Sequence, residues 1–189
     1  MQTQVVFGRM ALVLCLAPMS LSSWASEHEH HHHEHHHDFE SHQAHVHGAG
    51  LLTLVQDQQL LQLSLEVDTH SLWGFEHAPT NADEQQRVAQ ALSNLEAGHR
   101  LFSLSPDAQC QPDGVSVERP QGLDEPSAQD HMELQVQWQW RCASPAALTQ
   151  VTVRLFDQFP ELSQLTVQRL TPTGSGGGQL DRQHVTLDW

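Results

Sequence analysis

The chain has 189 residues and a formal net charge of −15 at neutral pH, because 23 acidic residues stand against eight Lys and Arg. A surface of this sign repels nucleic-acid phosphates and attracts cations, so we expect no nucleic-acid partner. The length is enough for one hydrophobic core. Sixteen histidines point to metal binding instead, because imidazole is a common ligand of divalent metal ions.

Residues 1–25 have the three-part layout of a secretory signal. A polar stretch with Arg9 precedes an apolar run from Met10 to Met19, and small residues follow at Ser23-Trp24-Ala25. The apolar run is too short to span a bilayer, which takes about 20 residues. We therefore expect a signal peptide over 1–25, export to the periplasm and no membrane span.

A histidine-rich segment follows at 26–44. Eleven of the 21 residues from Glu27 to His47 are histidine and five are acidic. Such a polar segment cannot bury enough apolar surface to offset the entropy of ordering, which predicts a disordered arm. Imidazole suits zinc, and nickel or copper as well, while the acids attract cations. We expect several weak, exchangeable metal sites in this arm, formed by His28, His30, His31, His32, His33, His35, His36, His37 and His42.

Two stretches of the arm, 28–32 and 33–37, match the H-E-x-x-H pattern of zinc proteases. That motif works on a helix, where both imidazoles share one face. Neither stretch has apolar residues at helical spacing to hold such a helix. We therefore expect a protein that is not an enzyme, with a zinc-dependent hydrolase as the less favoured alternative.

The folded part is expected over 45–189 and opens with apolar residues that alternate with polar ones. The alternation covers 52–54 and 61–67, and a short link at Asp57-Gln58 separates the two runs, which predicts a β-hairpin. Asn81 then precedes an acid at the third helical position. This capping pattern predicts a helix over about 82–97 that ends before Gly98.

The rest of the domain is predicted to be mostly strands. The longest, Met132 to Cys142, alternates strictly and has one wet face. Ser144-Pro145 predicts a short helical turn, and Gly174 to Gly178 a flexible turn. The expected fold class is α+β, one domain of mostly antiparallel sheet with one main helix. Shorter strands are expected at Val115–Val117, Val151–Leu155, Leu165–Val167 and His184–Leu187.

Two cysteines remain once the signal peptide is removed, Cys110 and Cys142. An even pair in an oxidising compartment predicts one disulfide. In the chain-entropy model, closing a loop of this size stabilises the fold by roughly 3–4 kcal/mol.

The histidines of the domain suggest one tighter metal site. His45 and His47 lie two apart, so in an extended segment both imidazoles point the same way, and Gly48 lets the backbone approach closely. His77 lies in the loop before the helix, beside Glu76 as a possible oxygen ligand.

His131 begins the long strand and completes this expected ligand set. His70, His99 and His184 have no companion in the sequence. We expect these three to be surface or core-edge histidines.

Five short motifs in order give the chain a resemblance to a known family. They are His45-x-His47-Gly48, Gly74-Phe75-Glu76-His77-Ala78-Pro79, Arg141-Cys142, Leu155-Phe156-x-x-Phe159-Pro160 and Thr171-Pro172-x-Gly174. From about His45 to the C-terminus the sequence resembles the ZrgA family of periplasmic zinc-uptake accessory proteins. The resemblance implies a zinc-binding domain that works with the binding protein of a zinc ABC importer. The expected function is therefore capture of periplasmic zinc for import, with a metal buffer or detoxification protein as the alternative.

Overall fold

A long β-hairpin opens the computed structural model, which describes residues 46–189 except 121 and 125–131. The hairpin joins β1 (Ala49–Asp57) to β2 (Leu60–Asp68) through a turn in which Gln58 has a positive φ of 51°. Leu54 pairs with Leu63, and the alternation of both strands places their leucines on one buried face. The predicted hairpin is confirmed. The expected signal peptide and histidine-rich arm lie outside the described residues.

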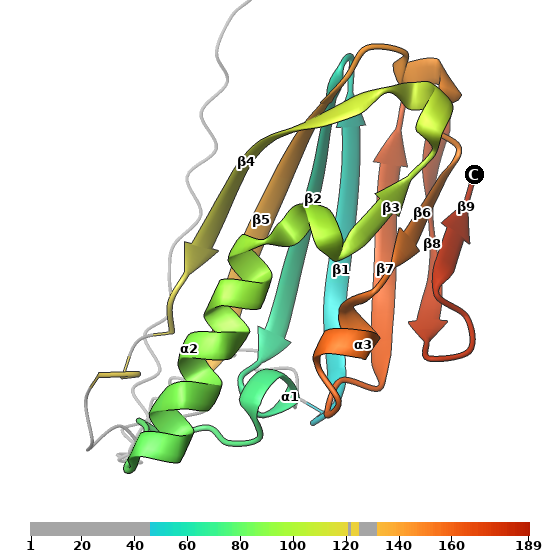
Figure 1. Cartoon of the computed structure of the whole chain (residues 1–189). Helices are drawn as coiled ribbons and strands as arrows, with labels where there is room; N and C mark the ends of the chain where they lie inside the picture. Colours follow the sequence, from blue (N-terminus) through green and yellow to red (C-terminus); the bar gives the residue numbers. More distant parts are fainter. Residues whose placement is uncertain (1–45, 121, 125–131) are drawn as a thin grey trace, which may run out of the picture. The chain divides into compact units, whose positions relative to one another are not determined.

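The hairpin lies at the centre of a six-stranded sheet of order β4-β5-β2-β1-β7-β8 (Figure 1). Neighbouring strands are antiparallel except β1 and β7, which run parallel. The other four strands are β4 (Cys110–Glu118), β5 (Glu133–Cys142), β7 (Gln164–Thr171) and β8 (Gly174–Asp181). The long strand predicted at Met132–Cys142 is thus confirmed as β5.

A smaller sheet of order β3-β6-β9 packs with the first. Its strands are β3 (Phe102–Leu104), β6 (Gln150–Val153) and β9 (Thr186–Asp188). The predicted strand at Val151–Leu155 is too long, because Leu155 already begins the short helix α3 (Leu155–Gln158). The helical turn expected at Ser144-Pro145 is present as a 3-10 turn, Pro145–Ala147.

The main helix and the small sheet cover the same face of the large sheet, and Trp138 of β5 is the contact point. Its indole Nε1 donates to the carbonyl of Leu95 in α2 (Ala82–Glu96) at 2.7 Å, and Phe102 of β3 meets its ring edge-on at 4.9 Å. A Cβ at Gly98 would lie 1.9 Å from the same indole. Glycine is therefore required where the helix ends, and Figure 1 shows α2 crossing this face.

The large sheet leaves its other face polar. Side chains such as Gln62, Ser64 and Gln137 lie there and are half-buried. Within the described residues, no helix is long and apolar enough to cross a membrane.

The glycine-rich segment does not form the predicted flexible turn, so that prediction is wrong. Gly174–Asp181 is strand β8, and its glycines pair with β7 from Gly174↔Thr171 onward. The turn lies one step earlier, at Pro172 and Thr173. Glycine has the same backbone N–H and C=O groups as other residues. A neighbouring strand can therefore hold a glycine-rich segment as a strand through backbone hydrogen bonds, although the segment shows no alternation of side chains. With this strand and the small sheet, the fold is more sheet-dominated than the α+β class predicted.

Helix α2 begins where the sequence predicts, with a reciprocal cap. Asn81 Oδ1 accepts from the backbone N–H of Glu84 at 3.0 Å, and Glu84 accepts from the backbone N–H and hydroxyl of Thr80. These hydrogen bonds from Thr80 hold the pKa of Glu84 below its usual range. Because the folded-state pKa is lowered, this contribution to stability is present at neutral pH and is lost as the pH falls through the lowered pKa.

Replacing Asn81 by Ala should reduce the free energy of unfolding by about 1 kcal/mol, because an orphan N–H loses its acceptor. Urea denaturation followed by circular dichroism measures this change. Gln86→Ala is the control, because it alters an exposed position in the same helix and should change stability by less than about 0.5 kcal/mol. Equal effects of the two substitutions would contradict the capping role.

The predicted disulfide is present between Cys110 and Cys142, which are direct partners in the β4–β5 ladder. Cys142 is 1% exposed and lies on the buried face of the sheet. The bond therefore ties the edge strand β4 to the core.

Replacing both cysteines by Ala should lower the free energy of unfolding by roughly 3–4 kcal/mol, because the unfolded chain regains the entropy of an open loop. Denaturant titration of the mature protein measures this loss. Alkylation after unfolding, without reductant, should detect no free thiol in the parent protein. Two reactive thiols there would contradict the disulfide in the exported protein.

Candidate metal site

The open end of the β1–β2 hairpin brings two histidines together. The register pairs Gly50 with Val67, so the two strands end near each other, and His47 and His70 lie in the turn and the short helix just beyond those ends. The two imidazole rings lie 4.5 Å apart between centroids and meet edge-on. Asp68, the last residue of β2, places a carboxylate next to both imidazoles.

His47 is held by the peptide group that follows it. A hydrogen bond from Ala49 N to Val46 O closes a turn, and Gly48 takes a φ of +84° within that turn. The Gly48 N–H donates to Ser71 Oγ at 2.8 Å. The Gly48 carbonyl accepts from the N–H and the hydroxyl of Ser163. The peptide groups on both sides of the Gly48 Cα are therefore fixed to other parts of the fold.

The short helix α1 (His70–Trp73) and the loop after it turn the chain back toward His47. Thr69 Oγ1 donates to the carbonyl of Phe75 at 3.0 Å and closes the loop. Gly74 ends the helix with a φ of +90°, and its N–H donates to the His70 carbonyl. The loop returns Glu76 to within 3.8 Å of His47, measured from Oε1 to Nδ1.

Ligand atoms of His47, Asp68 and His70 all lie within 4.8 Å of one another. His47 Nδ1 is 3.6 Å from Asp68 Oδ1. Four ligands bound to zinc at 2.0–2.1 Å are roughly 3.3 Å apart at the corners of a tetrahedron. The arrangement is therefore close to a nitrogen–oxygen set that could hold a divalent ion after small side-chain movements.

Burial differs sharply across this cluster. Asp68 is 4% exposed, whereas the side chain of His47 is 54% exposed. His70 Nδ1 is buried and makes no hydrogen bond to any atom of the described residues. A buried polar atom normally has a partner, because leaving it unsatisfied costs on the order of 1–3 kcal/mol. A metal ion at this position would satisfy it.

Of the five metal ligands expected from the sequence, His47 is part of this cluster, and Glu76 lies 3.8 Å from His47. His77 does not join the three-ligand group: its Nδ1 lies 2.9 Å from the Ala78 carbonyl, and its ring stacks on Phe75 with centroids 4.7 Å apart. His45 and His131 lie outside the described residues. The extended geometry expected of the His45–His47 segment is not found at His47, which lies in a turn.

Asp68 and His70 were not among the ligands expected from the sequence, and His70 was expected to have no companion. The signal that could have found them is the hairpin itself. Once the two-residue turn is placed at Gln58 and Gln59, the strand pairing brings the segments that carry His47 and His70 to the same end of the hairpin. The spacing of histidines along the chain gives no such information.

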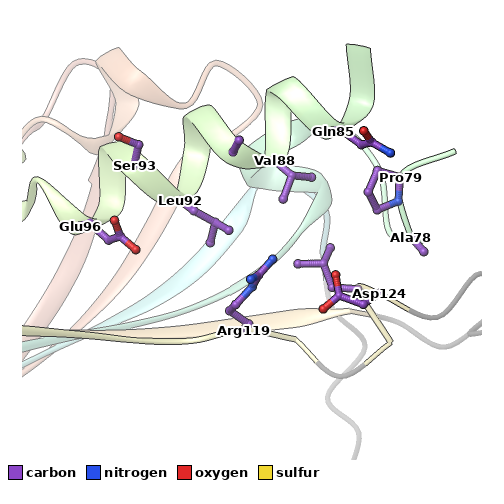
Figure 2. A pocket seen from close by; sticks show the side chains of 11 residues that line it. Ala78, Pro79, Gln85, Val88, Leu92, Ser93, Glu96, Arg119 and Asp124 are labelled. Carbon is purple, nitrogen blue, oxygen red and sulfur yellow. The ribbon is translucent and has the colours of Figure 1, made fainter. Parts of the chain in front are cut away.

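A different cavity, of about 560 Å³, lies between α2 and the segment that follows β4 (Figure 2). Val88 and Leu92 of the helix face Arg119 and Asp124 across it. No histidine or cysteine of the described residues lines this cavity. It therefore lacks the nitrogen and sulfur ligands that zinc prefers. The cluster of His47, Asp68 and His70, called the hairpin cluster below, is the better candidate site.

Comparison with known proteins gives one family. The model of the ZrgA family zinc uptake protein matches residues 44–189, which include the whole hairpin cluster. No curated protein matches the chain.

Replacing Gly48 by Ala should destabilise the protein by about 1–3 kcal/mol, because the residue has a positive φ. Its Cβ would also lie 2.9 Å from Ser163 Oγ and 3.1 Å from the Glu161 carbonyl. Gly114→Ala is the matched control, since a Cβ there would meet no atom within 4 Å. Thermal denaturation of the metal-free variants compares them, and an unchanged transition for Gly48→Ala would contradict the close packing at this turn.

Proposed function

The chain belongs to the ZrgA family of zinc uptake proteins, and from this we propose that it is a periplasmic protein that captures zinc and assists its uptake by a zinc ABC importer. The family match supports the zinc-related role. The signal-like sequence at 1–25 supports export, and a disulfide between Cys110 and Cys142 suits an oxidising compartment.

We propose that the tight site holds zinc through His47, His70 and Asp68. The observation that carries this proposal is the buried His70 Nδ1, which has no hydrogen-bond partner among the described residues. Glu76, 3.8 Å from His47, is the proposed fourth ligand. His45, His77 and His131 stay predictions from the sequence and are not needed to complete this four-ligand set.

This ligand set favours binding over catalysis. Two imidazoles and two carboxylates fill the four positions that zinc adopts in closed, tetrahedral sites. A hydrolytic zinc enzyme keeps one position open for water beside a general base. We therefore propose a cargo site and no enzymatic activity.

The histidine-rich arm gives the proposed mechanism its first step. We propose that no fold holds its many histidines and acids in place. They would therefore bind zinc weakly and exchange it quickly. The hairpin site then takes the ion, because ligands fixed by a fold lose less conformational entropy on binding. The final proposed step is release to the binding protein of the importer.

Calorimetric titration of the mature protein with zinc should show one tight event and several weaker ones. The double substitution His47→Ala and His70→Ala should remove the tight event, because it removes both nitrogen ligands of the cluster. Deleting residues 28–42 should instead remove the weak events and leave the tight one. His184→Ala is the control, since this exposed imidazole contacts Asp181 and lies outside the cluster.

Two results would contradict the assignment. Retention of the tight event in the His47 and His70 double variant would place the site elsewhere in the protein. Unchanged stoichiometry after the deletion would show that the arm is not the weak store.

A further inference from the structure

A single serine, Ser71, is hydrogen-bonded both to Asp68 and to Gly48, the residue that follows His47. The Ser71 backbone N–H donates to Asp68 Oδ1 at 2.8 Å, and its hydroxyl donates to Asp68 Oδ2 at 2.6 Å. The same hydroxyl oxygen accepts from the Gly48 N–H at 2.8 Å. Ser71 is fully buried, so water does not compete for these bonds.

The two bonds from Ser71 fix the rotation of the Asp68 carboxylate. Each carboxylate oxygen accepts one hydrogen bond and keeps further lone-pair capacity, because an ionised carboxylate offers about four acceptor sites. Oδ1 therefore remains able to bind an ion on the side where His47 Nδ1 lies 3.6 Å away. Without Ser71, the carboxylate would be free to rotate away from the imidazoles.

The third bond extends this control to the other ligand. Gly48 directly follows His47, and its N–H is held by the hydroxyl that also holds Asp68. One oxygen atom thereby sets the distance between the strand that supplies the carboxylate and the turn that supplies the exposed imidazole. Residues that orient metal ligands in this way typically change metal affinity by 10–100-fold when they are replaced.

We propose that Ser71 is a positioning residue of the zinc site: it does not touch the ion, and it aligns Asp68 with His47 before zinc arrives. The inference rests on the proposed function, because it takes Asp68 and His47 as zinc ligands. It goes further in naming the residue that sets the affinity of the site.

A double-mutant cycle tests the coupling, using zinc titration of the mature protein against a competing chelator. In the parent protein, Ser71→Ala should raise the dissociation constant of the tightest zinc-binding step by about 10–100-fold. In an Asp68→Ala background the same substitution should have a clearly smaller effect on the affinity, because only the bond to Gly48 is left for it to remove.

Ser163→Ala is the matched control. The Ser163 hydroxyl bonds the carbonyl of the same Gly48 residue at 2.8 Å but makes no bond to Asp68. It should leave the zinc affinity within about threefold of the parent value, whereas a purely structural role at Gly48 would make the two serine variants alike. If Ser71→Ala does not fold, Ser71→Cys replaces it in the cycle, because a thiol fills similar space but is a much weaker hydrogen-bond donor and acceptor than the hydroxyl.

The outcomes separate this inference from the function on which it rests. Equal losses in the two backgrounds, or equal losses for the two serine variants, would overturn the positioning role and leave the zinc site standing. A parent-like tight event in Asp68→Ala would show that the carboxylate is not a ligand, and both proposals would fall. Circular dichroism of each metal-free variant shows that folded proteins are being compared.

Discussion

The register of the β1–β2 hairpin is the constraint on which the candidate site depends. Side chains alternate along a strand, so a slip of one residue would move the buried leucines to the polar face and shift the strand ends beyond which His47 and His70 lie. The hydrophobic pattern therefore fixes the site indirectly. Leu52, Leu54 and Leu63 are at most 2% exposed, and the cost of exposing them holds the register that brings the open ends of the two strands together.

The site is built at the one end of the hairpin where both strands change direction. A turn at Gly48 and the short helix α1 carry the chain away from the sheet, and their backbone groups need partners there. Ser71, Ser163 and the Asp68 carboxylate supply these partners. The same hydrogen bonds that satisfy the ends of the strands thus hold the candidate ligands in place, so the arrangement requires no dedicated scaffold.

Local patterns predicted much of this fold because local physics determines those parts. The helix over 82–97 follows from Asn81 and its cap, and the hairpin follows from alternation. Strand β8 was missed because glycines show no alternation, and only the ladder with β7 orders them. His70 was missed for a related reason: its proximity to His47 depends on pairing across the hairpin, which a search for neighbours along the sequence does not consider.

The gradient of burial across the cluster matches what a cargo site needs. A protein that delivers an ion must hold it against dilution and also give it up. Asp68 and Ser71 are almost completely buried and mutually hydrogen-bonded, so they favour retention. His47 is 54% exposed, which leaves one ligand within reach of an incoming group from an acceptor. Ligand exchange that starts at His47 would let the acceptor form its first bond before the buried carboxylate releases the ion. In the proposed relay, transfer then proceeds without zinc passing through water.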